Sequence, residues 1–197
     1  MTAPLLILAS ASPRRYELLT QIGVPCRVET ADVDESPLAD ETPEALVLRL
    51  AQQKAQAVWQ RLAATPDGLP LPVLGADTLG LLNGELLLKP RDFADAQALL
   101  RRMSGRWHTI FTAVALVTAT GTSVVLNRNA VKFRSVSDAE ILAYWRTGEP
   151  CDKAGAYAIQ GRGAVFVERL EGSYSGVMGL PLFETAQLLA AAGIKTM

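Results

Sequence analysis

The stretch LLILASASPRRYELLTQIGVPCRV, residues 5–28, decides which class of fold to expect. Residues 5–9 are apolar and predict a short buried strand. Ser12-Pro13 then supplies a helix N-cap and a favoured first helical residue. The helix should end at about Ile22, and a second strand should run through residues 25–31. The chain therefore opens with a strand, a tight turn, a helix and a second strand.

Helix and strand signals alternate along the rest of the chain. Thr42-Pro43 predicts the start of a long helix to about Leu62, and Asp92 predicts the cap of a helix through about Met103. Asn83-Gly84 separates two apolar runs and is the strongest hairpin signal in the sequence. The other expected elements are a strand at 73–75, paired β-rich runs at 107–118 and 123–134, a helix capped by Ser137, a strand at 164–170 and a final helix from Pro181. This order predicts an α/β fold with a mixed, twisted sheet and flanking helices, with residues 1–197 forming a single domain.

The composition is that of an ordinary globular protein, with 49% hydrophobic residues, 20% charged residues and a formal charge of −1. No global positive field attracts nucleic acid or an anionic membrane, and no apolar run approaches the roughly 20 residues that span a bilayer. We therefore expect neither nucleic acid nor a membrane as partner. Residues 1–9 lack the features of a secretory leader, and Cys26 and Cys151 form no close-spaced framework, so a cytoplasmic location is expected.

The segment SASPRR, residues 10–15, stands between the first strand and the first helix. A helix N-terminus offers free backbone N–H groups and the positive end of the helix dipole, and two serines and two arginines add further donors. This combination is suited to holding a polyphosphate. The alternative is that Ser12 only caps the helix and the arginines are solvated.

Candidate acidic groups lie at three places in the sequence, which are residues 32–35, Asp77 and Asp152. Hydrolysis of a phosphoanhydride suits one carboxylate that holds Mg²⁺ and another that acts as general base. Asp77 is the best candidate for the base, because it follows the strand at 73–75 and ligands of α/β sheets bind at the carboxyl ends of strands. The alternative is an ordinary turn aspartate. His108 has neither cysteine near it in sequence, so a divalent cation would need oxygen ligands rather than a Cys/His site.

Two lysines and a glycine-rich segment complete the candidates. Lys54 lies at the border of the apolar face of its helix, and Lys89 precedes Pro90, which favours an extended backbone. Residues 152–163 contain three glycines that bring no evident folding gain, and Gln160 there offers a donor and an acceptor to a base or a ribose. Solvated lysines and simple turn glycines are the alternatives.

The sequence lacks the common signatures of other enzymes that bind nucleotides and of enzymes that hydrolyse esters. It contains no phosphate-binding loop of the Gly-x-x-x-x-Gly-Lys-Ser/Thr type, no Gly-x-Gly-x-x-Gly after a strand and no Gly-x-Ser-x-Gly elbow. Kinase, dehydrogenase and esterase functions therefore lose their usual support.

The ordered set of motifs resembles the Maf family of nucleoside triphosphate pyrophosphatases, from Leu6 to about Glu184. The motifs are Leu8 to Arg15, Val33 to Glu35, Leu50 to Ala55, Gly75 to Thr78, Lys89-Pro90, Ser104-Gly105, Asp152 to Tyr157, Ile159 to Gly161 and Gly179 to Leu182. Each motif alone is weak, whereas the ordered set is specific. The resemblance implies two lobes around a central cleft, a fold similar to the inosine triphosphate pyrophosphatases, a homodimer and a requirement for a divalent metal cation, Mg²⁺ or Mn²⁺.

The resemblance also implies roles for single residues. Asp77 matches the family's proton acceptor, with Lys54 and Lys89 as the other catalytic residues, and Glu35 with Asp77 as the metal ligands. The residues implied to bind the substrate are Ser10, Arg14, Arg15, Thr78 and Gln160.

The expected activity is hydrolysis of dTTP and UTP, or of modified pyrimidine nucleotides, to the monophosphate and pyrophosphate. Arg14, Thr78 and Gln160 match the positions that separate this branch from the one acting on 7-methyl-GTP. The alternatives are a 7-methyl-GTP pyrophosphatase and a nucleotide-binding regulator of cell division. Gly80 and residues 175–178 depart from the commoner family pattern, which bears on fine specificity rather than on reaction class.

Overall fold

The computed structural model describes residues 3–65 and 71–196, which divide into two compact units. Unit 1 comprises Met1–Thr78, Thr112–Asn127 and Gly179–Met197. Unit 2 comprises Leu79–Phe111 and Arg128–Met178. Three long strands contribute residues to both units. The expectation that the whole chain is a single domain with two lobes stays a prediction.

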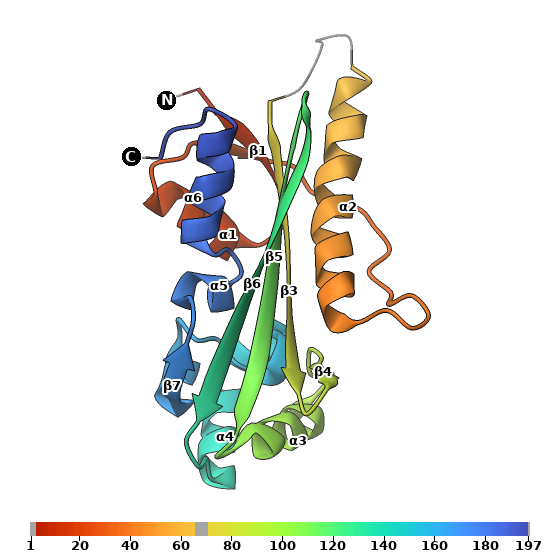
Figure 1. Cartoon of the computed structure of the whole chain (residues 1–197). Coiled ribbons are helices and arrows are strands. Elements are labelled where there is room, and N and C mark those ends of the chain that lie inside the picture. The colour runs from red at the N-terminus through yellow and green to blue at the C-terminus, as the bar shows by residue number, and fades with distance from the viewer. Residues whose placement is uncertain (1–2, 66–70, 197) are drawn as a thin grey trace. The chain divides into compact units, whose positions relative to one another are not determined.

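Helices and strands alternate as expected (Figure 1). The strands are β1 (Leu6–Ala9), β2 (Cys26–Val28), β3 (Val73–Leu82), β4 (Glu85–Leu87), β5 (Trp107–Thr118), β6 (Gly121–Phe133) and β7 (Val167–Glu171). The α-helices are α1 (Pro13–Gln21), α2 (Pro43–Ala63), α3 (Phe93–Met103), α4 (Asp138–Trp145), α5 (Tyr174–Met178) and α6 (Leu182–Ala191). Short 3₁₀ turns cover Glu149–Asp152, Ala154–Ala156 and Arg162–Phe166.

In the described residues the strands form one seven-stranded sheet in the order β2-β1-β3-β5-β6-β7, with β4 paired to β3. Strand β1 pairs in parallel with both β2 and β3, whereas β4 and β7 pair antiparallel with their neighbours. The predicted α/β fold with a mixed sheet and flanking helices is confirmed. Within the described ranges, no helix combines the length and the apolar character needed to cross a membrane.

The middle of unit 1 is built on β1, whose four residues are all buried. A parallel strand with neighbours on both sides is covered on both faces, which explains its uninterrupted apolar sequence. Within this unit, α2 lies on one face of the sheet, and α1 and α6 lie on the other (Figure 1). The buried side chains Leu18 and Leu19 of α1, Val47 and Val58 of α2 and Leu189 of α6 fill the two layers.

The local signals for helix starts are largely confirmed. Thr42 accepts a hydrogen bond from the Ala45 backbone N–H at 3.2 Å, and Asp92 accepts one from Asp95 at 2.9 Å. Ser137 forms a capping box with Glu140 at the start of α4. Ser12 occupies the N-cap position of α1, but its side chain makes no capping hydrogen bond. Among the described residues, the Ser12 side chain therefore leaves the backbone N–H groups in the first turn of α1 uncapped.

Several predicted strand bounds are wrong. β2 ends at Val28 rather than at residue 31, and β7 begins at Val167 because the residues before it form a 3₁₀ turn. The larger difference concerns β3, which is a single ten-residue strand rather than a short strand followed by a separate hairpin strand. Asp77 therefore lies inside a strand and not in a turn.

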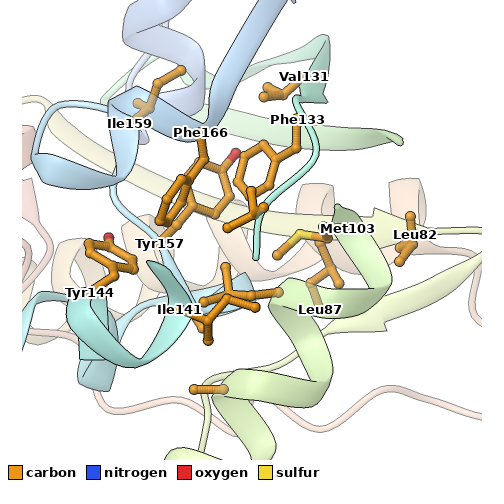
Figure 2. Close-up of a cluster of buried hydrophobic side chains, with 14 of the residues drawn as sticks. Leu82, Leu87, Met103, Val131, Phe133, Ile141, Tyr144, Tyr157, Ile159 and Phe166 are labelled. Atoms are coloured by element: carbon orange, nitrogen blue, oxygen red, sulfur yellow. The ribbon is translucent and has the colours of Figure 1, made fainter. Parts of the chain in front are cut away.

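The core of unit 2 is a hydrophobic cluster of aliphatic and aromatic side chains, including Phe133, Tyr144, Tyr157 and Phe166, which Figure 2 shows in close-up. Phe133 packs edge-on against His108 and Tyr157, with ring centroids 5.0 and 4.8 Å apart. His108 Nε2 and the Tyr157 hydroxyl are hydrogen-bonded at 2.8 Å, whereas His108 Nδ1 is buried without a partner in the described residues. Burial lowers the pKa of His108 to about 4. The imidazole is therefore neutral in the folded protein at physiological pH.

We expect His108 to make the protein sensitive to acid. The unfolded chain binds a proton at His108 below a pKa of about 6.5, whereas the folded chain resists protonation until about pH 4. The free energy of unfolding should therefore fall by about 2 kcal/mol between pH 8 and pH 5 through this residue. Urea unfolding at both pH values measures the fall. His108→Gln keeps a partner for Tyr157 but does not titrate, so it should lose about 2 kcal/mol less, and equal losses in both proteins would contradict the assignment.

The glycines of residues 152–163 have folding roles, so the expectation that they bring no folding gain is wrong. Gly155 has a φ of +74°, which favours glycine. A Cβ on Gly163 would lie 2.6 Å from the Tyr144 hydroxyl, and a Cβ on Gly161 would overlap the Glu149 carboxylate. That carboxylate accepts hydrogen bonds from the backbone N–H groups of Arg162 and Gly163 at 2.9 and 3.0 Å. The protein's own side chains, rather than a ligand, explain these close approaches.

Candidate functional site in unit 1

The site begins with an unusually close contact between helix α2 and strand β3. A Cβ on Gly75 would lie 2.7 Å from the Ala55 backbone nitrogen and would overlap the Ala51 carbonyl oxygen. Ala51 and Ala55 are one helical turn apart and fully buried, so the helix presents its smallest side chains to the strand. Gly75 therefore lets the helix backbone touch the strand, and Lys54, beside Ala55, comes within reach of residues just beyond Gly75.

Lys54 bridges two carboxylates. Its Nζ donates to Asp77 Oδ1 at 2.7 Å and lies 2.6 Å from Glu35 Oε1. The Lys54 and Asp77 side chains are each only 12% exposed, whereas Glu35 is 61% exposed. A buried lysine and a buried aspartate compensate each other's desolvation, and breaking such a pair leaves an uncompensated charge. The carboxylates of Glu35 and Asp77 thus contact the same positively charged atom, Lys54 Nζ.

The sheet register explains why Asp77 is available for chemistry. Ala9 is the last residue of β1 and pairs with Gly75 of β3. Asp77 therefore lies beyond the carboxyl end of β1, where β3 continues and the chain of β1 has turned toward α1. This is the edge at which α/β sheets bind ligands. Asp77 therefore does not follow the end of its own strand, as the sequence predicts, but lies beyond the end of the neighbouring strand β1.

Arg15, in the first turn of α1, is held by three hydrogen bonds. Its Nε donates to the Gly179 carbonyl at 2.8 Å, and its Nη atoms donate to Ser10 Oγ at 3.1 Å and Thr78 Oγ1 at 3.2 Å. Burial lowers the pKa of Arg15, the nearby negative charge of Asp77 opposes that shift, and the positive charge of Arg14 adds to it. Arginine remains charged despite such shifts, so a fixed cation interacts with the charge of Asp77.

Gly179 and Thr112 support Arg15 and were assigned no role from the sequence. Gly179 has a φ of +114°, and a Cβ there would lie 3.4 Å from Arg15 Nε. Thr112 on β5 is fully buried, and its hydroxyl is 2.9 Å from that of Thr78. Gly179 belongs to a quoted motif, whereas no local pattern marks Thr112, because its partner is 34 positions away.

Six of the candidate residues thus come together in unit 1: Ser10, Arg15, Glu35, Lys54, Asp77 and Thr78. The side chain of Arg14, which is partly exposed, makes no hydrogen bond or ion pair within the described part of the chain. Lys89 and Gln160 are exposed and belong to unit 2, so their roles stay predictions.

The oxygen donors of the site match a hard divalent cation. Mg²⁺ is usually held by one or two carboxylates together with substrate phosphates and water, rather than by a cage of protein ligands. Glu35 and Asp77 supply two such carboxylates, and both contact the Nζ atom of Lys54. Residues 3–65 and 71–196 contain no cluster of three or more His, Cys, Asp or Glu that could hold a metal alone. The residues present therefore suit a cation shared with a phosphorylated ligand.

The fold and the site define an α/β protein whose fixed guanidinium, lysine and paired carboxylates suit a phosphorylated ligand. The chain belongs to the Maf family, because the family profile described as Maf-like protein matches residues 5–192.

Named relatives are similar along nearly their whole length. A Hahella chejuensis protein named dTTP/UTP pyrophosphatase is 50% identical over 190 residues, covering 96% of this chain and 93% of that protein. A protein of the same name from Methylobacillus flagellatus is 53% identical over 187 residues, covering 95% and 92%. One from Alkalilimnicola ehrlichii is 54% identical over 189 residues, covering 94% and 92%. The solved structure of the Staphylococcus aureus Ham1 protein matches with a TM-score of 0.46 and 17% identity, over 65% of this chain and 71% of that chain.

Proposed function

We propose that this protein hydrolyses dTTP and UTP to the nucleoside monophosphate and pyrophosphate. The observation that carries the proposal is the contact of Lys54 with Asp77, beside an Arg15 already fixed by Ser10 and Thr78. A base next to fixed cations is what hydrolysis of a phosphoanhydride requires. Membership of the Maf family and the relatives named dTTP/UTP pyrophosphatase support the choice of substrate.

The proposed reaction is attack of water on the α-phosphorus. Asp77 accepts the proton of the water, a bond forms between the water oxygen and the α-phosphorus, and the bond to the leaving pyrophosphate breaks. Arg15 and Lys54 neutralise the charge of the phosphate oxygens as it develops. We assign a divalent cation, Mg²⁺ or Mn²⁺, to Glu35 and Asp77. When bound, it would supply further charge neutralisation on the phosphates.

We assign selection of the substrate's nucleobase to Arg14, Thr78 and Gln160. We assign a contact with a phosphate of the substrate to Lys89. Resemblance to the family alone supports the roles of Arg14, Gln160 and Lys89. Thr78 also contacts Arg15, whose guanidinium donates to its hydroxyl at 3.2 Å, but its part in selecting the nucleobase rests on the resemblance too. The same resemblance supports a homodimer, which light scattering would detect as twice the mass of one chain.

A substrate panel tests the proposed function. dTTP, UTP and 7-methyl-GTP are incubated with the purified protein and Mg²⁺ or Mn²⁺, and phosphate is measured with and without added inorganic pyrophosphatase. We expect phosphate from dTTP and UTP only after inorganic pyrophosphatase is added, because the released product is pyrophosphate. Direct release of phosphate would contradict the reaction, and preference for 7-methyl-GTP would contradict the substrate.

A further inference from the structure

Arg49 on α2 holds a segment of the neighbouring loop through its whole guanidinium group. Its Nε and Nη2 donate to the two oxygens of Glu41 at 2.7 Å each, and Nη2 also donates to the Ser36 carbonyl at 3.0 Å. Nη1 donates to Gln53 on the same helix at 3.0 Å. The Arg49 and Glu41 side chains are only 19% and 7% exposed. We call Arg49, Glu41 and Ser36 the Arg49 clamp.

The clamp acts on a long connection without helix or strand. Residues 29–42 join β2 to α2, and connections longer than about 12 residues are uncommon in compact domains and are usually either functional or disordered. Glu41 also accepts the Leu38 backbone N–H at 3.0 Å, and Asp34 accepts that of Ser36 at 2.9 Å. The backbone on the C-terminal side of Glu35 is therefore fixed by a network that Arg49 completes.

The position of the Glu35 carboxylate depends on this backbone more than the position of a buried side chain would. Its side chain is 61% exposed, so little packing holds it against Lys54. An exposed ion pair contributes little by itself, because both side chains lose rotamer freedom to form it. The close contact of Glu35 with Lys54 thus requires that the loop deliver the carboxylate to the right place.

We propose that Arg49 is a positioning residue that holds Glu35 against Lys54. The proposal rests on the proposed function only in giving Glu35 a role in the reaction. The contact itself can be tested without substrate or metal. Arg49→Lys keeps the charge but removes the planar fork, so it cannot hold both Glu41 oxygens and the Ser36 carbonyl together.

Chemical labelling of the Lys54 amine reads the contact directly. Each folded protein is treated briefly with acetic anhydride, and acetylation of Lys54 is measured by mass spectrometry relative to Lys195. In the parent protein Lys54 is 12% exposed and bound by two carboxylates. We expect labelling of Lys54 to rise several-fold in Arg49→Lys. Unchanged labelling would overturn the proposal.

Two further variants separate positioning from general loosening of the loop. Arg61→Lys is the matched control, because Arg61 lies on the same helix and holds the same loop at Thr30 and Glu29. It should leave the labelling of Lys54 unchanged, and an equal rise would overturn the proposal. Glu41→Gln removes one of the two oxygens that accept from Arg49, and it should raise the labelling of Lys54 as Arg49→Lys does. It also keeps the test decisive if Arg49→Lys fails to fold.

A double-variant cycle tests whether Arg49 acts through Glu35. Glu35→Gln should itself raise the labelling of Lys54, and adding Arg49→Lys to it should raise the labelling no further. The same cycle applied to kcat/KM should show a fall of about tenfold for Arg49→Lys in the parent and none in the Glu35→Gln protein. Additive effects would overturn the proposal. If the parent releases no pyrophosphate, the proposed function fails, whereas the labelling still decides the role of Arg49.

Discussion

Replacing Asp77 with asparagine is expected to leave a folded protein whose rate of pyrophosphate release falls by about 10² to 10⁴. Asparagine has nearly the same shape as aspartate, and its amide oxygen can still accept from Lys54 Nζ, which lies 2.7 Å from the Asp77 carboxylate. Glu35 continues to compensate the charge of Lys54. The substitution therefore removes the proton acceptor while retaining most of the local contacts.

The measurement is kcat with dTTP at saturating Mg²⁺, together with urea unfolding of the same preparation. Asp138→Asn is the matched control, because Asp138 also forms an ion pair, with Arg101 at 2.6 Å, but at an exposed position. An exposed pair contributes little to stability, and this variant should keep its full activity. If Asp77→Asn retains most of its turnover, Asp77 is not the base.

The sequence predicts those features of the fold that are encoded locally. Caps such as Ser137 and Asp92 act over three residues, and the Asn83-Gly84 turn needs only its own two residues to adopt positive φ. A single sequence contains such signals because the groups that interact in a cap or a turn are only a few positions apart in the chain. The bounds of β3 were missed for the opposite reason, since a strand that continues past Asp77 depends on the pairing of its neighbours.

The contacts of the site lie outside what local patterns encode. Lys54 and Asp77 are 23 positions apart, Arg15 and Thr78 are 63 apart, and Arg15 and Gly179 are 164 apart. The types of residue and their motif order predict a set of candidate groups, six of which the structure brings together in unit 1. Their convergence depends on strand register and on the close packing of α2 against β3, which no spacing along the chain reveals.

Gly75→Ala is expected to cause the second large effect, by forcing α2 away from β3. The new Cβ would lie 2.7 Å from the Ala55 nitrogen and 2.9 Å from its Cβ, and it would overlap the Ala51 carbonyl. Backbone atoms of a helix cannot move aside as a side chain can, so overpacking should cost about 1–3 kcal/mol or more. The same displacement carries Lys54 away from Asp77, so activity should fall in the fraction that remains folded.

Gly80→Ala provides the matched control on the same strand. A Cβ there would meet Leu87 Cδ1 and Ile110 Cδ1 at 3.1 Å, and these ends of flexible side chains can shift by a few tenths of an ångström. Urea unfolding should therefore show a much larger loss for Gly75→Ala than for Gly80→Ala, and kcat/KM for dTTP should follow the same order. Equal losses in the two variants would mean that the contact of α2 with β3 yields easily, and the close approach of Lys54 to Asp77 would then need another cause.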